Sequence, residues 1–262
     1  MRDTDVVKIE GGKRVLGMQQ ATAPKVSIIT STFNAAATIE KCLNSILFQS
    51  WTDREYLIID GGSTDGTPEL LKKYEESIDY WLIEPDEGVY DALNKGIALA
   101  RGEWIYFIGA DDYLIDSEVL QRVFEKDPSG LMIYGNVYFN VQGNIYSGKF
   151  SRCKLVTRNI CHQAIFYNKR LFEMFGRFDK RYRVLADWIF NLKCFFDKRV
   201  KPQYINTIIA YYYGKGFSER NTDVKFKEEY FEIIRMDYGW FYYCYLKFKI
   251  LTDKHVRARF QY

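Results

Sequence analysis

Apolar and polar residues alternate in blocks along the first half of the chain. Short runs rich in β-branched and aromatic residues predict four buried strands, at Val26–Thr30, Tyr56–Asp60, Tyr80–Glu84 and Trp104–Ile108. The stretches between these runs carry apolar residues at helical spacing and predict a helix capped by Asn34, a second helix opened by Pro68 and a third at Val89–Ala100. Four strand–helix repeats of this length indicate an α/β fold with a single, mostly parallel sheet and right-handed crossovers.

The pattern changes after Asp127-Pro128, where the proline closes a helix expected over residues 117–126. The second half predicts a hairpin, two helices and a last strand, at Ile133–Val141 with Ile145–Phe150, Lys169–Phe175, Asp187–Phe196 and Tyr204–Tyr213. We therefore expect one α/β domain over residues 24–218, with a first half at 24–128 and a second half at 129–218. Residues 1–23 show no periodicity and are expected to be a poorly ordered lead-in.

Residues 219–262 differ from the rest. Aromatic and aliphatic residues recur at roughly helical spacing from Phe226 to Phe248, and five cations follow or interleave with them: Lys247, Lys249, Lys254, Arg257 and Arg259. Such a segment suits a helix lying at a membrane surface. A terminal helix packed on the domain, with a solvated basic tail, explains the same pattern. Both interpretations stay open from the sequence.

Composition narrows the function classes. The net charge of the 262 residues is only +3, so a nucleic-acid partner is not expected. Five dispersed cysteines without a CxxC pair and only two histidines argue against structural zinc and suit a reducing cytosol. No apolar run is long enough to span a bilayer, and the charged N-terminus lacks a signal core. We expect a cytoplasmic protein, either free or peripheral on the inner face of the cell membrane.

The fourth strand ends in an acid pair, Asp111-Asp112, directly after Gly109 and Ala110. Two adjacent carboxylates repel each other unless a cation or a hydrogen-bond donor is present. Mg²⁺ and Mn²⁺ use one or two such carboxylates together with substrate phosphates. The pair therefore indicates either a metal site or the N-cap of the helix that follows.

Other polar or aromatic residues follow the other strands. Strand one leads into Ser31, Phe33 and Asn34, and strand two ends at Asp60. In a parallel sheet all these ends meet at one rim, where open α/β folds bind ligands. An aromatic residue, a lone acid and an acid pair around one crevice suit a nucleoside diphosphate.

At these residues the chain resembles family 2 glycosyltransferases, which are inverting, nucleotide-sugar-dependent enzymes of the GT-A fold. The resemblance rests on three ordered motifs: Val26 to Asn34, Ile59-Asp60-Gly61-Gly62-Ser63-Thr64-Asp65-Gly66-Thr67, and Gly109-Ala110-Asp111-Asp112. The block from Glu84 to Gly96 is similar to a bacterial branch near the colanic-acid and other polysaccharide transferases. The resemblance covers residues 25–215.

The resemblance implies roles in the first half. It places Ser31, Phe33 and Asn34 beside the base, Asp60 on the uracil, Asp111 near the ribose and Asp112 on a bound Mn²⁺ or Mg²⁺. The acid pair here replaces a strict Asp-X-Asp, which is a frequent variant in the family. Asp91 or Asn94 is expected to touch the donor sugar if the helix starts near Gly88. Asp65 is expected to order its own turn.

In the second half the resemblance places a catalytic acid at the start of a helix, where Asp187 stands, although Ala186 replaces the usual Glu. Asp187 is therefore the expected general base, with an N-cap as the alternative. Trp188 is expected to lie beneath the acceptor sugar and to contact it with the face of its ring. His162 is either an acceptor- or phosphate-side contact or an interior histidine. Lys215 either adds charge over the diphosphate or belongs to a plain turn.

The sequence thus predicts a metal-dependent inverting glycosyltransferase that uses a UDP-sugar and a glycan or lipid-linked acceptor, in cell-surface polysaccharide synthesis. Two other classes remain in view. A Rossmann-type methyltransferase or dehydrogenase is disfavoured because GxGxxG is absent after strand one. A non-catalytic nucleotide- or carbohydrate-binding module is disfavoured by the intact acids.

Overall fold

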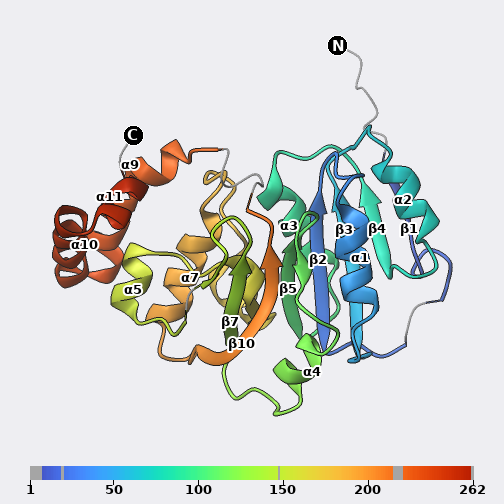
Figure 1. The fold of residues 1–262 in the computed structure, drawn as a ribbon, viewed down its shortest axis with the longest axis horizontal. Helices are drawn as coiled ribbons and strands as arrows, with labels where there is room; N and C mark the ends of the chain where they lie inside the picture. The colour runs from blue at the N-terminus through green and yellow to red at the C-terminus, as the bar shows by residue number, and fades with distance from the viewer. Residues whose placement is uncertain (1–7, 19–20, 147, 215–220, 261–262) are drawn as a thin grey trace.

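A computed structural model describes residues 8–18, 21–146, 148–214 and 221–260. Its centre is a single twisted sheet with helices on both faces (Figure 1). In spatial order the strands are β1 (Ile9–Gly11), β4 (Tyr80–Ile83), β3 (Arg54–Asp60), β2 (Val26–Thr32), β5 (Trp104–Gly109), β9 (Ile165–Asn168), β7 (Met132–Phe139), β10 (Gln203–Tyr212) and β6 (Tyr113–Leu114), with β8 (Asn144–Tyr146) paired to β7.

The first half contains the parallel sheet that the sequence predicts. Strands β4, β3, β2 and β5 are neighbours and run in the same direction. Their residues are buried on both faces, which explains why they read as continuous apolar runs rather than as alternating ones. The α/β prediction is confirmed, because β2, β3 and β4 are each followed by a helix that returns the chain to the start of another parallel strand.

The second half mixes directions. β10 runs parallel to β7, whereas β9 is antiparallel to both β5 and β7 and so joins the two halves into one sheet. The predicted hairpin is present but shorter, as β7 and β8. The sequence patterns did not predict β9, or the helix α5 (Arg152–Thr157), because each is too short to show a clear period.

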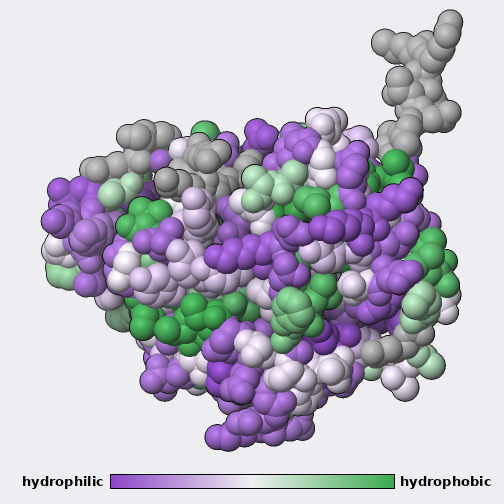
Figure 2. All heavy atoms as spheres, turned by 45° about the vertical axis from the view of Figure 1, so that its right-hand side comes forward, coloured by the Kyte–Doolittle hydropathy of each residue, from purple (hydrophilic) through white to green (hydrophobic). Residues whose placement is uncertain are grey.

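The helices divide between the two faces of the sheet. One face packs against α1 (Ile39–Leu47), α2 (Thr67–Lys73) and α4 (Val119–Phe124). The other packs against α3 (Val89–Leu99), α5, α6 (Arg170–Phe175) and α7 (Ala186–Phe196). Alternate strand residues enter the two cores, as in Ile28 and Ile29. The side turned forward in Figure 2 is largely hydrophilic, and its apolar residues form separate patches.

The prediction of a poorly ordered lead-in is wrong for the described residues 8–18. Ile9–Gly11 add an edge strand to β4, and the Tyr80 hydroxyl donates to Glu10 at 2.5 Å. Arg14 forms an ion pair with the nearly buried Glu55 at 2.6 Å. The partners lie far along the chain, so local periodicity gave no sign of this contact.

Helices also form the C-terminal segment, which is α9 (Val224–Ile233), a π-helical turn η2 (Ile234–Tyr238), α10 (Trp240–Thr252) and α11 (Lys254–Phe260). These helices pack beside α5 and α7 at the end of the molecule opposite β1 and α2 (Figure 1). The Tyr230 hydroxyl donates to the Val156 carbonyl at 2.8 Å. Among the described residues, no helix has the length and apolar character needed to cross a bilayer.

Candidate active site

The carboxyl ends of three parallel strands lie side by side. In the sheet register Thr32 of β2 is opposite Asp60 of β3, and Ser31 is opposite Gly109 of β5. Ser31 is half-buried, whereas the Phe33 side chain is 64% exposed just beyond the strand. The strand ends therefore bring the first-half candidates to one rim, as expected for a ligand site of an open α/β sheet.

Asp60 organises the loop that follows it. Its carboxylate is fully buried and accepts hydrogen bonds from the Gly62 and Ser63 amides, at 2.9 and 2.7 Å, and from the Ser63 hydroxyl at 2.6 Å. Gly62 has a φ of +89°, which a residue with a side chain rarely adopts. This loop geometry holds Asp60 in a fixed position and satisfies three of the roughly four lone-pair directions of its carboxylate.

Asn34 ties the first loop to this second loop. Its side-chain oxygen Oδ1 accepts a hydrogen bond from the backbone amide of Thr64 at 2.9 Å, and its backbone amide donates to the Ser63 hydroxyl at 2.7 Å. The idea that Asn34 caps a helix is wrong, because α1 begins only at Ile39 and its N-terminus has no side-chain cap. Asp65 orders its own turn as predicted, since it accepts from Thr67 and Ala36.

The acid pair does not cap a helix. α4 begins at Val119, preceded by Glu118, and has no side-chain cap. A Cβ atom added to Gly109 would lie 2.9 Å from Oδ1 of Asp111 and 3.0 Å from Oδ2 of Asp112. The two carboxylates therefore converge around a point that only a glycine leaves open. No group of three His, Cys, Asp or Glu side chains forms a metal site among the described residues. Two carboxylates fit a Mg²⁺ or Mn²⁺ whose other ligands come from substrate phosphates and water.

Asp112 is almost fully buried. It accepts hydrogen bonds from the Tyr213 amide, at 2.9 Å, and from the side-chain amide of Gln163. Burial and the neighbouring charge of Asp111 raise the pKa of Asp112 to about 8. A divalent cation bound beside the two carboxylates would act in the opposite direction and lower this pKa.

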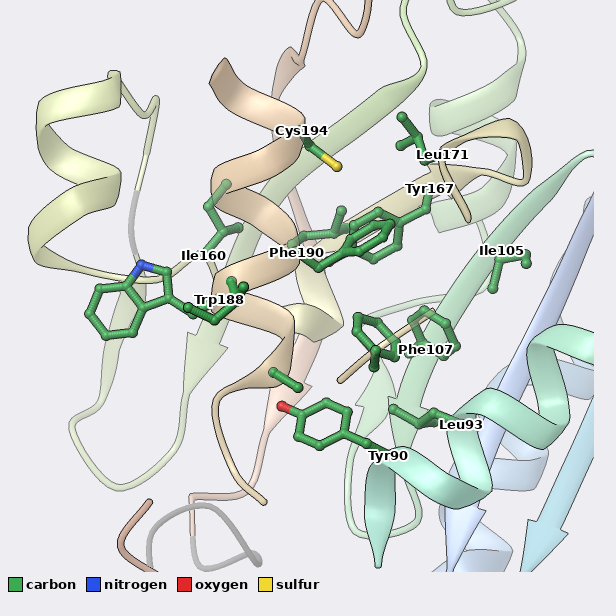
Figure 3. Packing of buried hydrophobic residues seen from close by; sticks show 14 of the residues in the cluster. Tyr90, Leu93, Ile105, Phe107, Ile160, Tyr167, Leu171, Trp188, Phe190 and Cys194 are labelled. Carbon is green, nitrogen blue, oxygen red and sulfur yellow. The ribbon is translucent and has the colours of Figure 1, made fainter. Parts of the chain in front are cut away.

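Asp187 lies in the first turn of α7 and is buried. The Tyr90 hydroxyl and the Asn159 side-chain amide each lie 2.9 Å from one of its carboxylate oxygens. Figure 3 shows Tyr90 reaching from α3 toward the start of α7. Burial raises the pKa of Asp187 to about 6, and the two hydrogen bonds act in the opposite direction. The N-cap alternative is wrong, because Leu185 precedes the helix and no side chain caps it.

One short segment connects the two acidic centres. Asn159 donates to Asp187, and Gln163, four residues later, donates to Asp112. Between them the Cys161 thiol donates to the side-chain oxygen Oε1 of Gln163 at 2.7 Å. Sequence reasoning did not assign roles to Asn159 or Gln163. The only available signal was their place beside His162 in an otherwise apolar stretch.

His162 is half-buried next to Gln163, and burial lowers the pKa of its imidazole to about 4. The ring is therefore neutral at neutral pH, so it can exchange hydrogen bonds but supplies no positive charge to a phosphate. Lys215, expected over the diphosphate, lies outside the described residues.

The structure shows that three other candidate site residues, Trp188, Asn94 and Asp91, make contacts within the protein. The prediction that Trp188 lies beneath the acceptor sugar is wrong, because its side chain is only 3% exposed and stacks on Phe226 with ring centroids 5.2 Å apart. Asn94 is a structural residue, since both ends of its side-chain amide bond to the Phe178 backbone. The Asp91 carboxylate forms ion pairs with Lys95 and Lys180, at 3.3 and 2.8 Å.

The comparison with protein families now decides the assignment. The family model described as "Glycosyl transferase family 2" matches residues 27–185, which include Asp60, Asp111 and Asp112 and end two residues before Asp187. A mycobacterial glycosyltransferase is 42% identical over 214 residues, covering 78% of this chain and 83% of the relative. This chain belongs to glycosyl transferase family 2.

The 42% relative of this family 2 glycosyltransferase is the "PGL/p-HBAD biosynthesis glycosyltransferase" of Mycobacterium bovis. A "Chondroitin synthase" of Escherichia coli is 29% identical over 80% of this chain and 32% of its own length. Staphylococcus aureus TarS with UDP-GlcNAc superposes with a TM-score of 0.64 at 20% identity, over 90% of this chain and 70% of TarS. The Pyrobaculum calidifontis mannosyltransferase PcManGT, with GDP-Man and Mn²⁺, superposes with a TM-score of 0.60 at 17% sequence identity. This match covers 98% of this chain and 81% of PcManGT. The fold is the GT-A fold.

Proposed function

We propose that this family 2 glycosyltransferase moves a sugar from a UDP-sugar to a hydroxyl group of a glycan or a lipid-linked acceptor, with inversion, in cell-surface polysaccharide biosynthesis. The observation that carries the proposal is the arrangement at the rim. Asp60 and the pair Asp111 and Asp112 stand at the carboxyl ends of neighbouring strands, and residues 159–163 link Asp112 to Asp187 through hydrogen bonds from Gln163 and Asn159.

The donor would bind across the strand ends. Phe33, exposed and at the rim, would lie against the uracil ring, and Asp60 would accept the N3–H of the base. Asp111 and Asp112 would hold a Mn²⁺ or Mg²⁺, which when bound neutralises charge on the departing diphosphate. In support, one structural neighbour contains UDP-GlcNAc and another contains GDP-Man with Mn²⁺.

Asp187 would serve as the general base. Its carboxylate takes the proton of the acceptor hydroxyl while that oxygen forms a bond to the anomeric carbon. The bond from this carbon to the phosphate oxygen breaks, and its electron pair leaves with UDP. A single displacement inverts the anomeric centre, so one carboxylate does all the proton transfer, unlike the pair used by glycosidases.

The acceptor is proposed to be reached on the cytoplasmic side, where a lipid-linked acceptor would lie at the membrane surface. UDP-hexoses and UDP-N-acetylhexosamines are the first donors to test, followed by TDP- and GDP-sugars.

The test measures nucleoside diphosphate release from a panel of nucleotide sugars with Mn²⁺, in the intact chain and in Asp112→Asn. We expect slow release from one UDP-sugar, abolished by the substitution while the melting temperature persists. Thermal stabilisation by UDP with Mn²⁺, but not by NAD or S-adenosylmethionine, separates this function from the Rossmann-type alternatives. Full metal-dependent release by Asp112→Asn contradicts the proposal, and stabilisation without any release favours a binding module.

A further inference from the structure

The outward face of α10 is apolar, which is unusual for a surface helix. At about 100° per residue, five of its residues share one arc of roughly 100°. Four of them are large side chains that are strongly exposed: Trp240 63%, Phe241 68%, Phe248 59% and Leu251 72%. Cys244, which is also exposed, lies between them. We call these five residues the α10 stripe.

The helix is held in place by its other side. Leu246 is fully buried, and Tyr242 packs edge-on against Phe196 of α7 with ring centroids 4.8 Å apart. The stripe is therefore not the core-facing side of a helix that has lost its partner. It is a second apolar side on a helix already docked against the domain, and a contiguous exposed patch of this kind marks an interaction site.

Charge around the stripe identifies the chemistry of the partner. Residues 239–262 contain five Lys or Arg and one Asp, a net charge of +4, whereas the whole chain carries +3. The preceding 238 residues therefore sum to −1. In the described part of the chain every ion pair lies at or before Arg235, so none of the cations near the stripe forms an ion pair, and Asp253 is the one acid among residues 239–262 that offsets their charge.

Two of these cations border the stripe directly. Arg257 donates to the carbonyls of Ile250, at 3.0 Å, and Leu251, which places its charge at the C-terminal end of α10. The Lys247 ammonium lies 4.2 Å from the ring centroid of Phe231, along the flank of the stripe. Large apolar side chains edged by Lys and Arg are the pattern of helices that lie in the interface of an anionic bilayer.

We propose that the α10 stripe docks on an anionic phospholipid surface, with Phe241, Phe248 and Leu251 in the acyl boundary and Lys247, Lys254 and Arg257 on the headgroups. A second copy of the chain is disfavoured as the partner, because a two-fold contact through this face would oppose two segments of charge +4. The inference does not depend on the transferase chemistry, since neither donor nor acceptor contributes to it.

The test is flotation of the full chain with vesicles of phosphatidylcholine alone or mixed with phosphatidylglycerol in equal parts. We expect binding to the mixed vesicles, weakened by salt. The double variant Phe241→Ser/Phe248→Ser should bind at least about tenfold more weakly. Lys247→Glu/Lys254→Glu should lose roughly the same factor or more, because each cation contributes to attraction by anionic lipid.

Matched controls use exposed residues elsewhere. Phe48→Ser removes an aromatic side chain that is 73% exposed at the end of α1, and Lys72→Glu/Lys126→Glu changes charge away from the stripe. Both should bind like the unmodified chain. Trp81, Trp104 and Trp188 are buried, and the half-buried Trp51 packs against Phe124 of α4, away from the stripe, so a blue shift of tryptophan fluorescence on vesicle addition should vanish in Trp240→Phe.

Three results would overturn the proposal. They are no binding to the mixed vesicles, binding that survives Phe241→Ser/Phe248→Ser, and a stable dimer in solution that the same variant dissociates. The assay contains no nucleotide sugar, so its failure would leave the proposed transferase activity untouched, and inactivity toward every donor would leave the docking surface untouched.

Discussion

The hydrogen bond from the Asn159 side chain helps to determine the pKa of the Asp187 carboxyl group. Its amide donates to one carboxylate oxygen at 2.9 Å, and removing it in Asn159→Leu deprives the buried base of one of its two side-chain donors. A hydrogen bond to a charged group contributes about 1.5–3 kcal/mol, and one pKa unit corresponds to about 1.4 kcal/mol. The substitution should therefore raise the pKa of Asp187 from about 6 by a further one to two units, to about 7–8.

The assay is the pH dependence of kcat under saturating donor and acceptor. A general base works when deprotonated, so activity falls as the pH drops through its pKa. In Asn159→Leu this acidic limb should move upward by about one to two pH units, while kcat above about pH 9 recovers toward that of the unmodified chain.

Other groups near Asp187 do not explain such a shift. Tyr90, Tyr167 and Cys161 face it, and burial raises the pKa of each well above its usual value, so all three stay neutral across the assay range. Asn168→Leu is the control, because it removes a buried amide from β9 that does not contact Asp187. An acidic limb that stays in place in Asn159→Leu, or that moves equally in Asn168→Leu, would refute the assignment of Asp187 as base.

Three further substitutions test the site. Asp187→Asn should lower kcat at least about 100-fold while leaving UDP affinity unchanged in calorimetry; unchanged kcat would rule out the base role. The same variant should be more stable in urea by roughly 1–3 kcal/mol at about pH 8. Because the pKa of Asp187 is raised, the folded protein binds more protons than the unfolded chain between about pH 4 and 6. The buried, ionised carboxylate therefore destabilises the fold above about pH 6, and Asn removes this charge. Equal stability of the variant and the unmodified chain at about pH 8 would contradict a buried, charged Asp187. Phe33→Ala should weaken UDP binding by about tenfold and change stability by less than about 0.5 kcal/mol, because the ring is exposed; a large loss of stability with intact affinity would show a packing role instead. Trp188→Ala should destabilise the fold by about 3–5 kcal/mol, measured by urea unfolding, because it empties a buried site. A stable variant with a raised KM for the acceptor would instead indicate that Trp188 contacts the acceptor sugar.

The parallel half of the sheet could be predicted because its strands are buried on both faces and its helices have one apolar side. Asp60 and the acid pair stand at strand ends, so their meeting at one rim follows from topology alone. Trp188 shows the limit of this reasoning. It follows Asp187 in sequence, but successive residues on a helix point about 100° apart, so it enters the core while Asp187 faces Tyr90 and Asn159.

The polar contacts of the site could not be predicted. Gln163 reaches Asp112 across 51 residues of sequence, and Tyr90 reaches Asp187 across 97. No local period encodes such pairs, because they depend on how β9 joins the two halves of the sheet. The edge strand β1 was missed for the same reason, since its partner β4 lies some seventy residues away.

The central claim is that Asp111 and Asp112 hold a divalent cation against the diphosphate of a nucleotide sugar. The most direct measurement is a crystal structure with UDP and Mn²⁺, in which anomalous scattering locates the metal. We predict a single manganese peak within ligand distance of a carboxylate oxygen of Asp112, beside the diphosphate, with the uracil beside Asp60. A nucleotide bound elsewhere, or a manganese peak away from both carboxylates, would contradict the account.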